Sequence, residues 1–303
     1  MMESPIVQVT ASGATMTKPW IALCDRWIAR TAQPIPAALA AVSGLRPAVV
    51  VTGGSSGIGL AIAHAFAREG ETVVLVARNP ERLASARASF GAGRTGVFTG
   101  PLDVTTLGAP AALDAALAGL GLYLDILVNS AGIGLAGAFE SHNPEDIDRL
   151  LALNIAALTR FTRHAVPQMR ARARGGVLNV SSLGGYVPGP NQAAYYASKA
   201  YVCSLTEALA AKLAGTGVRV MVLAPGPVDT KFHDSMGAGN ALYRWLLPAL
   251  SPERAARAAV FGYRLGRRVV VPGLIPKALA VAVTVLPHAL TAPLLRAILA
   301  PRI

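Results

Sequence analysis

The stretch that decides the fold is AVVVTGGSSGIG, residues 48–59. Its first four residues form a short, continuous apolar run, which is typical of a strand buried on both faces of a sheet. Four glycines follow within the remaining residues and predict a tight turn. A helix pattern then runs over 58–68, and Gly70 ends it. A buried strand, a glycine-rich turn and a helix in direct succession are the opening unit of a parallel α/β sheet.

The alternation of strand and helix patterns continues along most of the chain. Further β-branched or apolar runs occur at 72–76, 97–99, 125–128, 177–180, 218–223 and 268–271. Strands separated by helices of this length predict a parallel, doubly wound sheet with right-handed crossovers. We therefore expect one α/β domain of the Rossmann type over 47–273. It is flanked by an N-terminal extension over 1–46, with a short helix near 21–30, and by an apolar helical C-terminal extension over 274–303.

The composition excludes several classes of protein. Apolar residues make up 53% of the 303 residues, so the chain can bury a large core. The net charge of +12 comes mostly from arginines spread singly along the chain, which argues against nucleic-acid binding. The two cysteines, Cys24 and Cys203, cannot form a disulfide framework. No Cys/His cluster has the spacing of metal ligands, so we expect no metal site.

The N-terminus bears on the compartment. Residues 1–5 lack the basic-then-apolar order of a signal peptide, and the few cysteines suit a reducing compartment. We therefore expect a cytoplasmic protein. Met16 is an alternative to Met1 as the initiator.

The glycine turn has a chemical interpretation as well as a structural one. Glycines let the backbone approach a diphosphate closely, and the free N–H groups of the following helix then face the anion. A glycine-rich turn alone is a weak signal, because many loops contain several glycines. Its place between a buried strand and a helix is what a diphosphate site requires.

A second motif lies further along the chain. Tyr195 and Lys199 are four residues apart, so on a helix they share one face. A nearby ammonium favours the phenolate, so we expect Lys199 to lower the pKa of Tyr195 and make it a proton donor. Ser182 ends a strand pattern, where its hydroxyl could hydrogen-bond a developing alkoxide. A Tyr-x-x-x-Lys pair alone would more often be structural, and Ser181 is the competing serine.

Together these motifs resemble the short-chain dehydrogenase/reductase family. Gly53, Gly57 and Gly59 have that family's T-G-x-x-x-G-x-G spacing, and the resemblance covers roughly residues 47–271. It implies that Tyr195 is the general acid and base, that Lys199 also binds the nicotinamide ribose, and that Ser182 orients the substrate oxygen. Asn154 is similar to the asparagine of the family's proton relay. The resemblance implies a nicotinamide-cofactor site formed by Gly53, Ser55, Ser56, Gly57, Ile58, Gly59, Arg78, Asn79, Asp103, Val104, Asn129, Ala131, Gly132, Tyr195, Lys199, Pro225, Gly226, Val228 and Thr230.

Two details refine this site. The end of the second strand carries Ala77-Arg78-Asn79 and no carboxylate, where a carboxylate typically holds the ribose 2′-hydroxyl of NAD. Arg78 is placed to cover a 2′-phosphate, which favours NADP(H), although a lone arginine is ordinarily just a surface residue. Ser130 departs from the asparagine that is more frequent there in the family. We interpret Tyr196 as a packing residue.

The segment after the second proline-glycine turn, at 225–226, is apolar and contains Phe232, Met236, Leu242, Tyr243, Trp245 and Leu246. It indicates a hydrophobic substrate, and packing against the core or a partner subunit is the equal alternative. The C-terminal extension is interrupted by Pro276, Pro287 and Pro293, which argues against a single membrane span. It could cover the pocket, form a dimer contact or be a shallow membrane anchor.

The sequence thus predicts an NADP(H)-dependent oxidoreductase that interconverts a hydrophobic carbonyl and alcohol, in a homodimer or homotetramer. One alternative is an alcohol dehydrogenase working oxidatively with NAD(P)+. The other is a non-catalytic nucleotide-binding or scaffold protein, because a fold does not fix a function.

Overall fold

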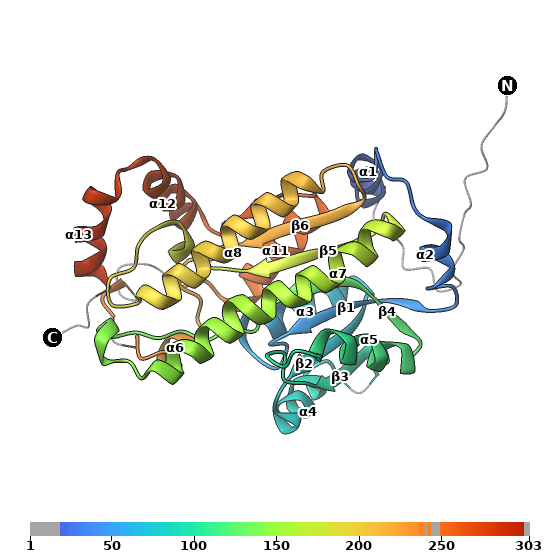
Figure 1. Ribbon diagram of the computed structural model, residues 1–303, viewed down its shortest axis with the longest axis horizontal. Coiled ribbons are helices and arrows are strands. Elements are labelled where there is room, and N and C mark those ends of the chain that lie inside the picture. Colours follow the sequence, from blue (N-terminus) through green and yellow to red (C-terminus); the bar gives the residue numbers. More distant parts are fainter. Residues whose placement is uncertain (1–18, 92, 240, 244–248, 300–303) are drawn as a thin grey trace.

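The structure is a computed structural model that describes residues 19–91, 93–239, 241–243 and 249–299. Its centre is a parallel sheet of seven strands in the order β3-β2-β1-β4-β5-β6-β7 (Figure 1). The strands are β1 (Arg46–Thr52), β2 (Thr72–Ala77), β3 (Val97–Pro101), β4 (Leu122–Asn129), β5 (Gly175–Val180), β6 (Val218–Leu223) and β7 (Val269–Val270). The predicted doubly wound α/β fold is therefore confirmed.

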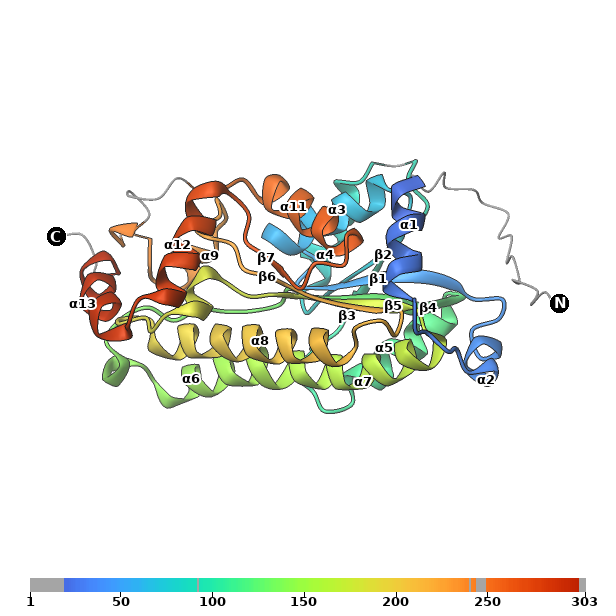
Figure 2. The same ribbon diagram turned by 90° about the horizontal axis from the view of Figure 1, so that it is seen from above.

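Helices cover both faces of this sheet, which lies edge-on between them in Figure 2. One layer contains α3 (Gly57–Arg68), α4 (Pro80–Ala88) and α11 (Pro252–Arg264). The other contains α5 (Ala109–Gly119), α6 (Pro144–Leu151), α7 (Leu158–Arg172) and α8 (Ala193–Lys212). A π-helical turn, η2 (Ala152–Ala157), joins α6 to α7. The short helices η1 (Phe139–Ser141), η3 (Leu183–Tyr186) and α9 (Phe232–Ser235) lie in the connections.

The packing of helices on both faces of the sheet explains why the strands are continuous apolar runs in the sequence. Val49 and Val51 of β1 pack toward α3 and α11, whereas Val50 packs toward α5 and α7. Successive side chains of a strand point to opposite faces, so a strand covered on both sides must be apolar at every position. All four residues from Ala48 to Val51 are at most 1% exposed.

The strand order also fixes where a ligand can bind. β1 pairs with β2 on one side and with β4 on the other, so the order of the chain reverses between β1 and β4. In open parallel sheets, ligands bind beyond the carboxyl ends of the strands at such a reversal point. Thr52 and Asn129 are paired neighbours at those ends.

The two extensions lie at opposite ends of the molecule (Figure 1). α1 (Pro19–Ile28) and α2 (Pro36–Ala40) form the N-terminal one, and an ion pair between Asp25 and Arg219 joins α1 to β6. The C-terminal extension forms α12 (Leu274–Val285) and α13 (His288–Ile298), beyond the carboxyl ends of the strands. The residues 1–18, which include Met16, lie outside the described residues.

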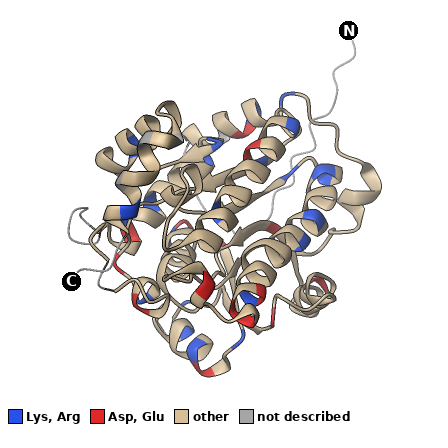
Figure 3. Cartoon of the chain, turned by 60° about the vertical axis from the view of Figure 1, so that its left-hand side comes forward, with Lys and Arg blue, Asp and Glu red and all other residues tan. Residues whose placement is uncertain are grey.

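α12 has several large apolar side chains that the rest of the described chain does not cover. Leu274, Val281 and Val285 are 87%, 62% and 77% exposed, and Ala280 is its buried residue. Within the described residues, no helix combines the length and the apolar character needed to span a bilayer. Lysines and arginines appear on many separate elements in Figure 3 rather than in one stretch, as the sequence pattern indicated.

Candidate active site

The glycine turn between β1 and α3 has the geometry that only glycine allows. A Cβ atom on Gly59 would lie 2.5 Å from the carbonyl oxygen of Gly53, and a Cβ on Gly53 would lie 2.8 Å from the backbone of Ala131. Gly57 has a φ of 55°, in the left-handed region. Ser56, with Ser55 before it, precedes α3 without making a side-chain cap, so the first-turn N–H groups from Gly57 onward have no side-chain partner there. The glycine turn and the free N–H groups at the start of α3 therefore form a site that fits a diphosphate.

The turn faces a second segment that the sequence placed at the site. The nearest atom to a Cβ built on Gly57 is Cγ2 of Thr230, at 3.5 Å. Thr230 follows the turn at Pro225, Gly226 and Val228, whose backbone is fixed by pairing between Val228 and Leu250. The first and last segments of the predicted nucleotide site therefore meet across the crevice, although they lie far apart in the sequence.

The loop after β4 is held by a residue that the sequence argument quoted but did not assign to the site. The hydroxyl of Thr52 accepts hydrogen bonds from the N–H groups of Ser130 and Ala131, at 3.2 and 3.3 Å. Asn129 is 4% exposed, and its amide donates to Thr162 and to Asn179. Asn129 thus connects the ends of β4 and β5 through its side-chain amide. Its expected contact with the cofactor stays a prediction.

Residues at the ends of β2 and β3 form the far side of the crevice. Arg78 is exposed, and its charge helps to lower the pKa of Asp103. The larger causes are hydrogen bonds to Asp103 from the hydroxyl and N–H of Thr105. Asn79 caps α4 by accepting from Arg82 N at 2.6 Å, a structural role that the sequence argument did not foresee. Val104, after Asp103, is 7% exposed and belongs to the core.

Ser182 and Tyr195 are brought together from two elements. Ser182 lies just beyond β5, where its hydroxyl accepts from Gly184 N at 3.1 Å and lies near enough to Tyr195 to lower the pKa of the phenol. Ser181, the competing serine, points the other way: its hydroxyl donates to the carbonyl of Lys199 at 2.8 Å. Tyr196 packs against glycines, because a Cβ on Gly189 would lie 2.3 Å from its ring.

Lys199 lies one turn beyond Tyr195 on α8. Its Nζ atom is 5.7 Å from the centre of the Tyr195 ring and donates to the carbonyl of Val180 at 3.0 Å. A Cβ on Gly132 would lie 3.6 Å from the same Nζ atom, so the loop after β4 passes close to the ammonium.

The pKa of Tyr195 is shifted in the direction opposite to our expectation. Burial raises the pKa of the phenol, the hydrogen bond from Ser182 opposes the shift, and the nearby Tyr243 adds to it. Burial also lowers the pKa of Lys199 to about 8, because a buried ammonium loses its hydration. In the chain by itself, desolvation therefore outweighs the attraction between the two groups. Both shifts favour the uncharged forms.

Asn154 lies in the π-helical turn η2 and is 1% exposed. Its side chain accepts from Ile133 N at 3.0 Å and donates to Ile133 O at 2.8 Å. It also donates to the hydroxyl of Ser198, which the sequence argument missed. π-turns are rare and frequently occur at functional sites, because they turn one side chain out of the regular helical pattern.

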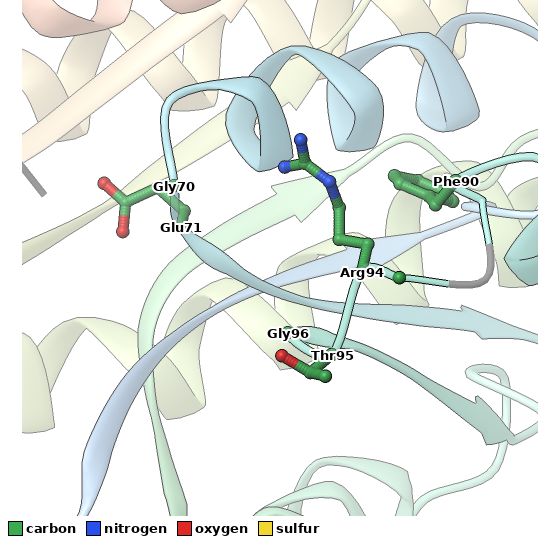
Figure 4. Close-up of a pocket in the computed structure, with 7 residues that line it drawn as sticks. Gly70, Glu71, Phe90, Arg94, Thr95 and Gly96 are labelled. Atoms are coloured by element: carbon green, nitrogen blue, oxygen red, sulfur yellow. The ribbon is translucent and has the colours of Figure 1, made fainter. Parts of the chain in front are cut away.

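A hollow of about 500 Å³ lies elsewhere, at the amino edge of the sheet before β2 and β3 (Figure 4). Its lining includes Glu71, Phe90 and Arg94. None of the predicted site residues borders it, so it does not belong to the candidate active site.

Comparison with known proteins agrees with this geometry. Residues 47–241 match the family model of the short chain dehydrogenases. An uncharacterized oxidoreductase from Staphylococcus saprophyticus is 36% identical over 214 residues, which are 70% of this chain and 88% of that protein. A short-chain dehydrogenase from Sphingobium yanoikuyae, solved with NADPH, is 29% identical, with a TM-score of 0.69 over 82% of this chain and 94% of that one.

A third relative is the 3-ketoacyl-(acyl-carrier-protein) reductase from Brucella melitensis, solved with NADH. It is 30% identical, with a TM-score of 0.65 over 75% of this chain and 97% of that one. The chain belongs to the short-chain dehydrogenase/reductase family. It is an oxidoreductase that uses a nicotinamide cofactor to interconvert a carbonyl and an alcohol.

Proposed function

We propose that this enzyme is an NADP(H)-dependent reductase of hydrophobic ketones or aldehydes. The observation that carries the proposal is the meeting of Ser182, Tyr195 and Lys199 at the carboxyl edge of the sheet, beside the glycine turn. A carbonyl reduction needs three groups from the protein. Here Tyr195 is the proton donor, Ser182 the hydrogen-bond donor that orients the carbonyl oxygen, and Lys199 the cation that stabilises negative charge.

The cofactor supplies the hydride, and the chain's own residues supply the proton. The raised pKa keeps the Tyr195 phenol protonated at neutral pH, which is the form that donates to the carbonyl oxygen. Ser182 orients that oxygen with its hydroxyl. When the proton leaves, the phenolate gains a hydrogen bond from Ser182 and the charge of Lys199, so the same groups stabilise the product state. Asn154 holds the backbone beside Gly132 in place.

The preference for NADP(H) rests on Arg78. Its guanidinium is exposed at the end of β2, and no carboxylate follows there to hold a ribose 2′-hydroxyl. A guanidinium binds a phosphate through paired, charge-assisted hydrogen bonds, so this position favours the 2′-phosphate. The relatives do not decide the matter, since one was solved with NADPH and another with NADH.

The hydrophobic substrate is supported by the surroundings of Tyr195. The phenol belongs to a buried apolar cluster with Leu150, Met236 and Tyr243. Met236 lies directly on the loop after β4, because a Cβ on Gly134 would be 2.8 Å from its terminal carbon. Trp245 and Leu246, from the same apolar segment of the sequence, lie outside the described residues.

The test is an NADPH oxidation assay over a panel of ketones and aldehydes, with NADH in parallel. We expect turnover of apolar carbonyls with NADPH, and a Tyr195→Phe variant that binds NADPH like the wild type but loses at least a thousandfold in kcat. A wild-type protein that binds NADPH but reduces no carbonyl would favour the non-catalytic alternative.

Three further expectations stay predictions. The first is the physiological direction, which could also be alcohol oxidation with NAD(P)+. The second is assembly into a homodimer or homotetramer, and the third is peripheral membrane contact through the C-terminal extension.

A further inference from the structure

α13 contributes leucine side chains to the surroundings of Tyr195. Leu299, which ends this helix and donates its N–H to Leu295 O at 2.8 Å, is 4% exposed. It belongs to the same buried cluster as Tyr195 and Leu150, and Leu295 and Ile298 pack at the border of that cluster. Residues at the end of α13 therefore belong to the apolar cluster that contains Tyr195.

α12 holds α13 in this position through contacts with two loops of the site. Pro276 of α12 lies against the second proline-glycine turn, because a Cβ on Gly226 would be 3.1 Å from its Cγ atom. α12 also contacts η3, the short helix that directly follows Ser182. The hairpin of α12 and α13 thus touches the segments after β5 and β6 as well as the surroundings of Tyr195 (Figures 1 and 2).

The two helices differ in how they use their apolar residues. The large side chains of α12 point outward, as the 87% exposure of Leu274 shows. Leu295 and Ile298 of α13, by contrast, pack against the buried cluster. Beside the same cluster, the Tyr243 hydroxyl hydrogen-bonds His233 Nδ1 at 2.7 Å. The side chains by which the end of α13 meets the cluster, Leu295, Ile298 and Leu299, are all apolar.

We propose that α13 is the substrate-selecting wall of the active site, and that Leu299 and Leu295 contact the apolar group beside the carbonyl of the substrate. The inference rests on the proposed carbonyl reduction and adds the specificity-determining residues. It assigns the enzyme to ketones that carry an uncharged alkyl or aryl group, because Leu299 and Leu295 offer no partner for a charge.

The test measures kcat/KM with NADPH for a series of 2-alkanones from 2-butanone to 2-nonanone. Leu299→Ala removes apolar volume from the cluster around Tyr195 and should raise the ratio of kcat/KM between long and short ketones at least tenfold. Leu299→Phe adds apolar volume there and should lower that ratio at least tenfold, since a single methylene in a pocket is worth roughly 10- to 200-fold. Leu295→Val is a milder variant in case the Leu299 variants fold poorly, and it should shift the ratio in the direction of Leu299→Ala.

The matched control is Leu274→Ala, which makes the same substitution at an exposed position of the same extension. It should leave the chain-length profile unchanged. Profiles identical to the wild type in Leu299→Ala, Leu299→Phe and Leu295→Val would overturn the inference, while reduction of the ketones would leave the proposed function standing.

A binding measurement separates the two proposals. Tyr195→Phe saturated with NADPH is titrated with 2-octanone in a calorimeter, with and without Leu299→Ala. If the wild type reduces no ketone but Leu299→Ala still changes the affinity for 2-octanone tenfold, α13 is the wall of a binding site and the reductase proposal fails. If 2-octanone does not bind at all, the substrate class that we assign to the wall is wrong.

Discussion

The side-chain amide of Asn154 donates to the hydroxyl of Ser198, with 3.1 Å between Nδ2 and Oγ. That hydroxyl donates in turn to the carbonyl oxygen of Tyr195 at 2.7 Å. Both residues are buried, at 1% and 0% exposure. Two hydrogen bonds therefore connect the π-helical turn η2 to the turn of α8 that carries Tyr195.

The first prediction concerns how much the hydrogen bond between Asn154 and Ser198 contributes to stability. Ser198→Ala should lower the free energy of unfolding by about 1 kcal/mol, because it removes one acceptor of Asn154. Asn154→Ala should cost about 2–3 kcal/mol, because it leaves the N–H and C=O of Ile133 without their side-chain partner.

A double-mutant cycle of urea unfolding gives the coupling between the two residues. We expect an interaction energy of at least about 0.5 kcal/mol. Additive effects would mean that the hydrogen bond contributes nothing to stability.

The second prediction concerns the glycine turn. In Gly59→Ala, the new Cβ would press on the carbonyl oxygen of Gly53, so the turn must shift. We expect a loss of about 1–3 kcal/mol in stability and an affinity for NADPH at least tenfold weaker, measured by fluorescence titration.

Gly108→Ala is the matched control. Gly108 has an ordinary φ of −81°, and a Cβ there meets no atom within 4 Å. This variant should bind NADPH like the wild type and be as stable or slightly more stable. Equal NADPH affinities for the two alanine variants would show that the turn does not hold the diphosphate.

The third prediction tests cofactor preference. Arg78→Ala should lower kcat/KM for NADPH about 10- to 100-fold and leave that for NADH within about threefold, because the 2′-phosphate loses its charged partner. Arg82→Ala removes the same charge from an exposed position on the neighbouring turn of α4. Should both variants lose NADPH activity equally, the effect would be one of overall charge and not of a specific contact.

The fourth prediction follows from the pKa of Lys199. Its pKa in the folded chain is lowered from 10.5 to about 8, so folding is opposed by the cost of burying the charge at every pH below about 8. That cost fades between pH 8 and 10.5, as first the folded and then the unfolded chain loses the proton. By 1.36 kcal/mol per pKa unit, the full cost is on the order of 3 kcal/mol.

Lys199→Met should therefore raise the Tm of the cofactor-free enzyme at pH 7 while abolishing turnover, and the gain in Tm should shrink from pH 8 to pH 10.5. The lost hydrogen bond to Val180 O offsets about 1 kcal/mol of the gain. Lys212→Met, at an exposed position on the same helix, should change Tm little at any pH. A gain for Lys199→Met that does not depend on pH would contradict the lowered pKa.

The sequence by itself determined the sheet, the glycine turn and the order of the motifs. Apolar runs such as 48–51 and helices of standard length leave few ways to build a parallel sheet, so local pattern and chain connectivity suffice. The spacing of Tyr195 and Lys199 placed both on one face of a helix for the same reason: it depends only on helical geometry.

The tertiary structure decided what depends on burial and on contacts between distant segments. The pKa of Tyr195 rises because the phenol is enclosed by residues from separate parts of the chain, and helical spacing carries no information on that enclosure. Asn79 and Asn129 turned out to hold a helix and two strands, through partners that the motif does not name. The position of Leu299 in the same cluster as Tyr195 depends on how α12 packs against Gly226, and a run of apolar residues in the sequence does not determine that direction.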